Sequence, residues 1–242
     1  MLKEIRNNNK LAFNFVIINF IIGTLLFYET LFRPIKIILI TLLISYLPFI
    51  IFFIISLLSC HLKDNLKAIK VIKIITKILI YLQVFYYFMA IFIISILISL
   101  NPVTNPKYYK FFVNSDELTK VFPKQIPDNV KNVQFYYAPG VLQGSTDYVL
   151  YYIDENINLD KFNNYFKDKA IWIGHKEEYT EKKGLLTGTF SFTPIEYKNE
   201  DDFIIYLIKG ECDDSGYCNH GKYLFAAINE NTNEIIYKLS FW

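Results

Sequence analysis

Three residues with reactive side chains lie close together in the stretch ECDDSGYCNHGK, residues 211–222. Cys212, Cys218 and His220 are of the types that build metal sites, reactive thiols and disulfides. Structural zinc sites usually combine two closely spaced ligand pairs, and redox dithiols are typically C-x2-C, whereas this stretch holds a single C-x5-C pair. The spacing leaves all three alternatives open, so the compartment that the stretch occupies must decide among them.

The distribution of charge divides the whole chain into two parts. Residues 1–100 carry 10 basic and 3 acidic side chains, a net charge of +7, and residues 101–242 carry 15 basic and 20 acidic ones, a net charge of −5. The overall charge of +2 describes neither part. A negative second part argues against a nucleic-acid partner.

Three charge-free apolar runs occupy the first part, at residues 11–28, 37–60 and 78–100. With 18, 24 and 23 residues, each is long enough to cross a hydrocarbon core of about 30 Å as a helix. The first run exceeds the usual apolar segment of a signal peptide, and no small-residue cleavage pattern follows it, so we expect it to be retained. Residues 1–100 are therefore predicted to be a membrane region with the lipid bilayer as its partner.

Five lysines between the second and third runs indicate the orientation. Positive charge stays on the cytoplasmic side, so we expect the N-terminus and this connection inside and the second part of the chain outside. The same lysines follow one side of a helix, which either lies on the inner leaflet as a lipid-binding surface or runs straight into the third span as a topology anchor. They are Lys63, Lys67, Lys70, Lys73 and Lys77.

The interiors of the three runs contain no Asp, Glu, Lys, Arg or His. Because proton relays and ion pathways usually need such groups, we expect a membrane anchor rather than a transporter or channel. Six polar residues in the runs are candidates for hydrogen bonds between helices. They are Asn14, Asn19, Tyr46, Gln83, Tyr86 and Tyr87.

An outward-facing second part places the opening stretch in an oxidising compartment. There we predict a Cys212–Cys218 disulfide rather than free thiols, and no metal site. Closing a loop of about seven residues stabilises the folded state by roughly 2–2.5 kcal/mol. Cys60 falls at the cytoplasmic end of the second run and is expected to stay reduced.

The second part has the pattern of an α+β domain with a mainly antiparallel sheet and about two helices on one face. We place this domain at residues 115–242, after an extended stem over 101–114 that contains two Asn-Pro pairs. Strands are predicted at 132–138, 147–153, 170–174, 184–193, 202–209, 223–229 and 234–241, and helices at 115–122 and 158–170.

The element FPKQIPDNVKNVQFYYAPGVLQG, from Phe122 to Gly144, resembles a pattern in uncharacterised bacterial membrane-anchored and lipoprotein-like proteins. The resemblance covers about 23 residues, and Ser145 stands where a further glycine often follows in that pattern. It implies a location at the membrane and a related fold, with no assigned activity and no catalytic residue. The matching positions are Phe122, Pro123, Lys124, Ile126, Pro127, Phe135, Tyr137, Leu142, Gln143 and Gly144.

Elsewhere the second part has little that favours catalysis. His175 precedes Glu177 and Glu178 and is most simply a polar residue after a strand, and the acidic stretch 154–160 is typical of a turn and helix start. The common nucleophile, metal and phosphate-binding motifs are missing from the sequence, so we predict no cofactor and assign no catalytic residue. Several tyrosines either form a contact surface for a protein or glycan or fill the two faces of the sheet: Tyr108, Tyr109, Tyr136, Tyr151 and Tyr152.

These patterns together predict a non-catalytic module at a cytoplasmic membrane. The presence of 23 Lys and only two Arg is typical of AT-rich coding and indicates a bacterial source. Its outer domain is expected to bind a protein or another component of the cell envelope. One alternative is an envelope enzyme or a thiol or metal protein that uses Cys212, Cys218 and His220. Another is an accessory subunit of a transport or secretion complex.

Overall fold

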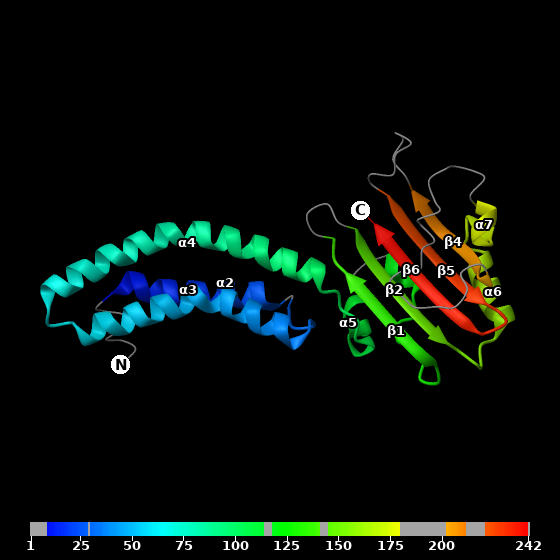
Figure 1. Ribbon diagram of the computed structural model, residues 1–242, viewed down its shortest axis with the longest axis horizontal. Coiled ribbons are helices and arrows are strands. Elements are labelled where there is room, and N and C mark those ends of the chain that lie inside the picture. Colours follow the sequence, from blue (N-terminus) through cyan, green and yellow to red (C-terminus); the bar gives the residue numbers. More distant parts are fainter. Residues whose placement is uncertain are drawn as a thin grey trace. The chain divides into compact units, whose positions relative to one another are not determined.

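The computed structural model describes residues 9–28, 30–113, 118–140, 145–179, 202–211 and 221–241 (Figure 1). The chain divides into two compact units, Met1–Asn101 and Pro102–Trp242. The first unit is helical and the second contains a six-stranded antiparallel sheet with helices. This arrangement confirms the predicted fold class.

In its described residues the first unit contains three long apolar helices: α2 (Lys10–Tyr28), α3 (Ile35–His61) and α4 (Leu66–Leu100). Each has the length and composition to cross a membrane. Large apolar side chains cover their outer surfaces, as lipid contact requires; Leu25 is 69% exposed and Val84 is 74% exposed. The prediction of three helices that are long and apolar enough to span a membrane is therefore confirmed.

Helix α2 packs closely against α3 because Gly23 has no side chain. A Cβ atom at this position would lie 2.8 Å from the backbone oxygen of Ser45, which is too close for any other residue. Nearer the start of α2, Ala12 lies in a buried cluster with Phe52 and Ile55 of α3.

Helix α4 begins twelve residues before the predicted third span. Asn65 caps its first turn by accepting a hydrogen bond from the backbone nitrogen of Ala68 at 3.0 Å. The helix then continues unbroken to Leu100, and Ile72 packs on the cluster that contains Phe52. Lys63 lies in the turn before α4, while Lys67, Lys70, Lys73 and Lys77 are exposed on its first three turns. The helix that carries these lysines therefore runs without a break into the predicted third span.

Polar side chains join the three helices inside the first unit. Asn19 of α2 is fully buried; its amide donates to Gln83 Oε1 at 3.2 Å and accepts from the Tyr87 hydroxyl at 2.7 Å. The hydroxyl of Tyr86 donates to the backbone oxygen of Ile44 at 2.6 Å. Tyr46 is hydrogen-bonded to Thr24. Five of the six predicted residues therefore join helices, and Asn14 alone differs because it is exposed.

The sheet of the second unit has the strand order β1-β2-β6-β5-β4-β3 and is antiparallel throughout. Its strands are β1 (Lys131–Ala138), β2 (Thr146–Ile153), β3 (Trp172–Gly174), β4 (Ile204–Glu211), β5 (Lys222–Asn229) and β6 (Glu234–Phe241). The described helices are η1 (Pro106–Tyr108), α5 (Tyr109–Val113), η2 (Leu118–Val121), α6 (Leu159–Lys167) and α7 (Lys176–Tyr179). The predicted strand 184–193 lies outside the described residues, as do Ser115 and the other residues that would begin the predicted helix 115–122.

Both faces of the sheet are buried. One face, called here the helix face, includes Leu150, Tyr237 and Ala226, which the strand register places side by side. Rings from α5 and α6 pack on this face; Phe112 stacks on Tyr137 at 4.4 Å, and Phe166 lies 6.0 Å from Tyr237. The opposite face holds the apolar core cluster of Val149, Tyr151, Phe203, Ile205, Leu207, Tyr223, Phe225, Ala227 and Ile236.

The stem predicted over residues 101–114 is not extended in the structure. Val103 forms an isolated antiparallel bridge with Tyr137 of β1, and Tyr109 and Val113 of α5 are buried. The two Asn-Pro pairs predict an extended chain. Asn105 instead caps a helical turn by accepting a hydrogen bond from the backbone nitrogen of Lys107 at 3.1 Å. The domain therefore begins near Pro102 rather than at residue 115.

A candidate binding site: an aromatic cleft

Cys212, Cys218 and His220 lie outside the described residues. The strands on either side of them are described. Glu211 at the end of β4 pairs with Lys222 at the start of β5, so the stretch connects two neighbouring strand ends. Cys60 is a free thiol near the end of α3.

Local hydrogen bonds form turns and helix ends around His175 and in the acidic stretch 154–160. The Glu178 carboxylate accepts a hydrogen bond from the backbone nitrogen of His175 at 3.2 Å, which closes the first turn of α7. Asp154 accepts from the backbone nitrogen of Asn156 at 3.1 Å, and Asn158 caps α6 by accepting from the backbone nitrogen of Lys161 at 2.8 Å. Within the described residues, no three His, Cys, Asp or Glu side chains are placed to hold a metal ion.

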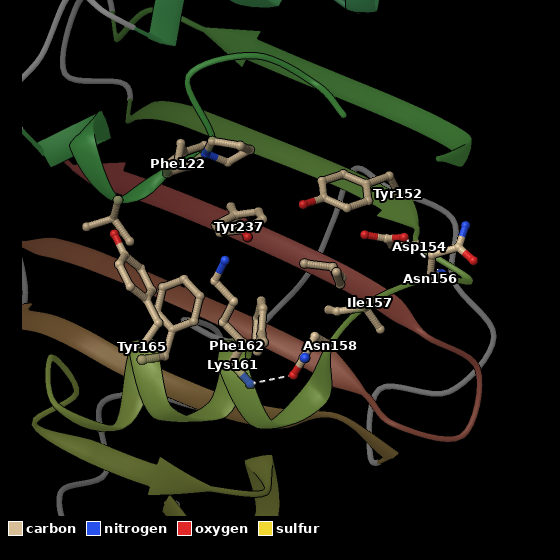
Figure 2. Close-up of a pocket in the computed structure, with 14 residues that line it drawn as sticks. Phe122, Tyr152, Asp154, Asn156, Ile157, Asn158, Lys161, Phe162, Tyr165 and Tyr237 are labelled. Atoms are coloured by element: carbon tan, nitrogen blue, oxygen red, sulfur yellow. Dashed lines mark hydrogen bonds between the residues drawn. The ribbon is translucent and has the colours of Figure 1, made fainter. Parts of the chain in front are cut away.

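A cleft of about 500 Å³ lies on the helix face of the sheet, between α6 and the segment that follows η2 (Figure 2). Its volume is in the range of small-ligand sites. Strands β2 and β6 contribute its floor, including Tyr152 and Tyr237. The lining residues are Val121, Phe122, Pro123, Tyr152, Asp154, Asn156, Ile157, Asn158, Lys161, Phe162, Tyr165, Phe166, Ile235 and Tyr237.

Aromatic contacts hold the walls of the cleft to its floor. The ring of Tyr237 lies 5.5 Å from Phe122 on one side and 6.0 Å from Phe166 on the other, and Phe162 lies 4.6 Å from Phe166. Such tilted pairs add about 0.5–1.5 kcal/mol each beyond their burial. The hydroxyl of Tyr109 donates to the backbone oxygen of Pro123 at 2.5 Å and fixes the first wall.

Polar contacts fix the position of α6, which carries the second wall. The Tyr206 hydroxyl of β4 donates to Asn163 Oδ1 at 2.8 Å, and the Asn163 amide donates to Glu230 at 2.9 Å. Nearer the end of the helix, the Lys169 ammonium lies 3.5 Å from the centre of the Tyr165 ring. The cleft therefore has two supported walls.

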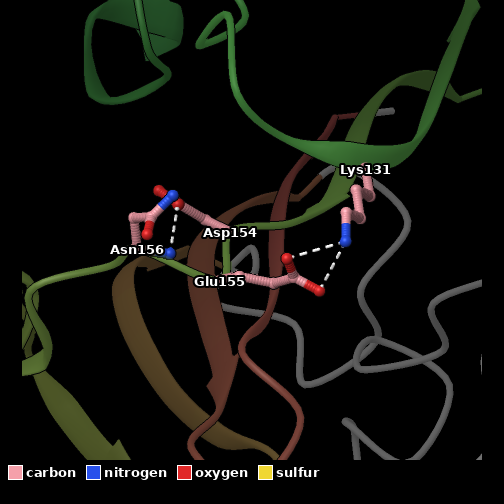
Figure 3. Close-up of polar contacts among 4 residues, drawn as sticks. All are labelled: Lys131, Asp154, Glu155 and Asn156. Carbon is pink, nitrogen blue, oxygen red and sulfur yellow. Dashed lines mark hydrogen bonds and ion pairs between the residues drawn. The ribbon is translucent and has the colours of Figure 1, made fainter.

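Two charged side chains, Lys161 and Asp154, lie at the rim of the cleft. Figure 2 shows the Lys161 ammonium reaching toward the cavity from α6 and the Asp154 carboxylate pointing toward it from the end of β2. The neighbouring Glu155 has a different role, because both of its carboxylate oxygens lie 2.7 Å from the exposed Lys131 ammonium (Figure 3). Lys161 and Asp154 thus offer one charge of each sign to a bound molecule.

The two tyrosines of the floor stay protonated over the physiological range. Burial and, to a smaller extent, the nearby Asp154 carboxylate raise the pKa of Tyr152 to about 12, against the lowering effect of the hydrogen bond with Tyr237. Burial also raises the pKa of Tyr237 well above its ordinary value, and the hydrogen bond with Tyr152 acts in the same direction. These hydroxyls therefore serve as neutral hydrogen-bonding groups and are unsuited to act as bases.

No protein-family model, curated protein or solved structure matches this chain. The resemblance of the Phe122–Gly144 element to uncharacterised bacterial membrane-anchored proteins stays a prediction. Two of its positions, Phe122 and Pro123, line the cleft, and Phe135 and Tyr137 pack under α5. Leu142, Gln143 and Gly144 lie outside the described residues.

The sequence predicted a helix at 158–170, which corresponds to α6, and the resemblance included Phe122 and Pro123. The sequence did not predict that these residues line a common cleft. The interpretation of the tyrosines as an exposed surface was wrong for Tyr109, Tyr151 and Tyr152, which are 1%, 4% and 3% exposed. The alternative that they fill the two faces of the sheet is correct for Tyr151 and Tyr152, which are neighbours in β2 and point to opposite faces, whereas Tyr109 belongs to α5.

Proposed function

We propose that this chain is a non-catalytic, membrane-anchored module of a bacterial cell envelope. Its C-terminal domain is displayed outside the cytoplasmic membrane and binds an amphipathic envelope component in the aromatic cleft. The observation that carries the proposal is the cleft itself, with aromatic walls, neutral tyrosine hydroxyls on its floor and charges of both signs at its rim. Such a site suits a molecule with an apolar or ring face and charged substituents.

The outward orientation is supported by the distribution of lysines. Four of the five lysines between the second and third spans are exposed on the first turns of α4. Such positive charge favours the cytoplasmic side of a membrane. An odd number of spans then places the second unit on the other side. In that compartment we propose that Cys212 and Cys218 form a disulfide.

Binding is tested with the full chain in detergent micelles and soluble peptidoglycan fragments, which carry sugar rings, ammonium groups and carboxylates. Lys161→Ala and Phe162→Ala are expected to weaken binding by about tenfold or more, because each removes a group that lines the cleft. The measurement is a calorimetric dissociation constant.

Lys167→Ala is the matched control, since Lys167 lies on the same helix and does not line the cleft. It is expected to bind as the wild type does. Fragments that bind all four proteins equally would exclude the cleft as their site. An absence of any binding would exclude this class of envelope component.

Orientation is tested by labelling intact cells with a bulky, membrane-impermeant maleimide and measuring the mass shift. Cys212 and Cys218 are expected to react only after mild reduction. Labelling without reductant would support the outward orientation and contradict the disulfide. Labelling only after the cells are lysed and reduced would contradict the orientation.

A further inference from the structure

Helix α2 carries two lengthwise rows of residues, one on each side. The inner row, Ala12, Asn19 and Gly23, is buried within the first unit. The residues of the outer row are exposed and spaced by three and four positions in strict alternation, which is the repeat of a left-handed helix pair. The outer row consists of Leu11, Asn14, Ile18, Ile21, Leu25 and Tyr28.

Each row contains one asparagine, and only the inner one has its hydrogen bonds satisfied. Asn19 is 0% exposed and is bonded to Gln83 and Tyr87 of α4. Asn14 lies five residues earlier and so points about 140° away around the helix. It is exposed, and no hydrogen bond of its side chain is found within the described residues.

An asparagine on a lipid-facing surface is unfavourable unless its amide is paired. Asn14 lies one turn inside the span, about 6 Å beyond Lys10, and its side chain is too short to reach far along the helix. A hydrogen-bonded pair of side chains from neighbouring helices contributes about 0.6–2 kcal/mol in membranes. The other members of the outer row are apolar or aromatic and supply packing on both sides of the amide.

We infer that the outer row of α2 binds the outer row of a second copy of this chain. Copies inserted in the same orientation hold Asn14 at the same depth, so a two-fold axis along the membrane normal brings the two amides together. An amide carries a donor and an acceptor, and each copy therefore satisfies the other without a third group. A single polar residue in an otherwise apolar row also defines the register of the pair.

Self-association is tested with the full chain in phosphatidylcholine vesicles, by energy transfer between donor- and acceptor-labelled copies over a series of protein-to-lipid ratios. The wild type is expected to show transfer that rises with this ratio and fits a dimer. Asn14→Leu should raise the dissociation constant about 3- to 30-fold, because it removes the paired amides and keeps an apolar row. Asn14→Gln keeps an amide and should retain most of the association.

Val84→Leu on the exposed surface of α4 is the matched control and should leave the dissociation constant unchanged. The side chains of Asn14 and Val84 are both exposed, so helix content should be unaltered in each variant. Monomeric wild-type protein at the highest ratio would overturn the inference, as would equal association of wild type and Asn14→Leu. An Asn14-dependent complex with a different membrane protein, formed by a chain that does not self-associate, would also overturn it.

Discussion

Replacing Tyr237 by alanine is expected to lower the free energy of unfolding of the C-terminal domain by about 3–5 kcal/mol, the range for large buried aromatic residues. Tyr237 is 6% exposed at the centre of the helix face. Its ring contacts Phe122, Phe166 and Tyr152, so its loss opens a cavity between both walls of the cleft and their floor.

The measurement is urea unfolding of the full chain in detergent, followed by tryptophan fluorescence, because both tryptophans belong to this domain. Tyr165→Ala is the matched control from the rim of the same cleft, where the side chain is 46% exposed, and should cost less than about 1 kcal/mol. Equal effects of the two substitutions would show that the ring of Tyr237 is not a central packing element.

Alkaline pH is expected to destabilise the same domain steeply. Burial raises the pKa values of Tyr109, Tyr152 and Tyr237 above the ordinary value of about 10. Above that pH the unfolded chain releases these protons while the folded domain keeps them. The stabilisation is therefore complete below about pH 10 and is lost as the pH rises through the folded pKa values. Between about pH 10 and its folded pKa, each tyrosine lowers the free energy of unfolding by about 1.4 kcal/mol per pH unit. The three together lower it by about 4 kcal/mol per pH unit.

The experiment follows tyrosinate absorbance and circular dichroism in parallel as the pH is raised. A cooperative loss of structure that coincides with late tyrosine ionisation is expected. Tyr152→Phe removes one of the titrating groups and should reduce the slope by about 1.4 kcal/mol per pH unit between about pH 10 and the Tyr152 pKa of about 12. Ionisation of all tyrosines near pH 10 with the structure intact would contradict the buried arrangement.

The hairpins of the sheet follow from local sequence, whereas its assembly does not. Strands β1 and β2 are consecutive neighbours, and β3, β4, β5 and β6 form a second consecutive series. Alternating apolar residues and turns predict each strand, because those signals act over a few positions. The pairing of β2 with β6 joins residues more than eighty positions apart, such as Tyr151 and Ile236, and no local pattern specifies it.

Local sequence patterns are sufficient to predict the division of the chain, its three long apolar helices and the α+β class of its second unit. These features depend on hydrophobicity, charge and short-range periodicity, which are summed along the chain without reference to distant residues. Three features depend on the tertiary structure. They are the hydrogen bonding of Asn19 but not Asn14 within the described residues, the burial of particular tyrosines, and the position of α6 opposite Phe122 across a cleft. Each of these depends on a partner from a distant part of the chain, and only packing brings that partner into contact.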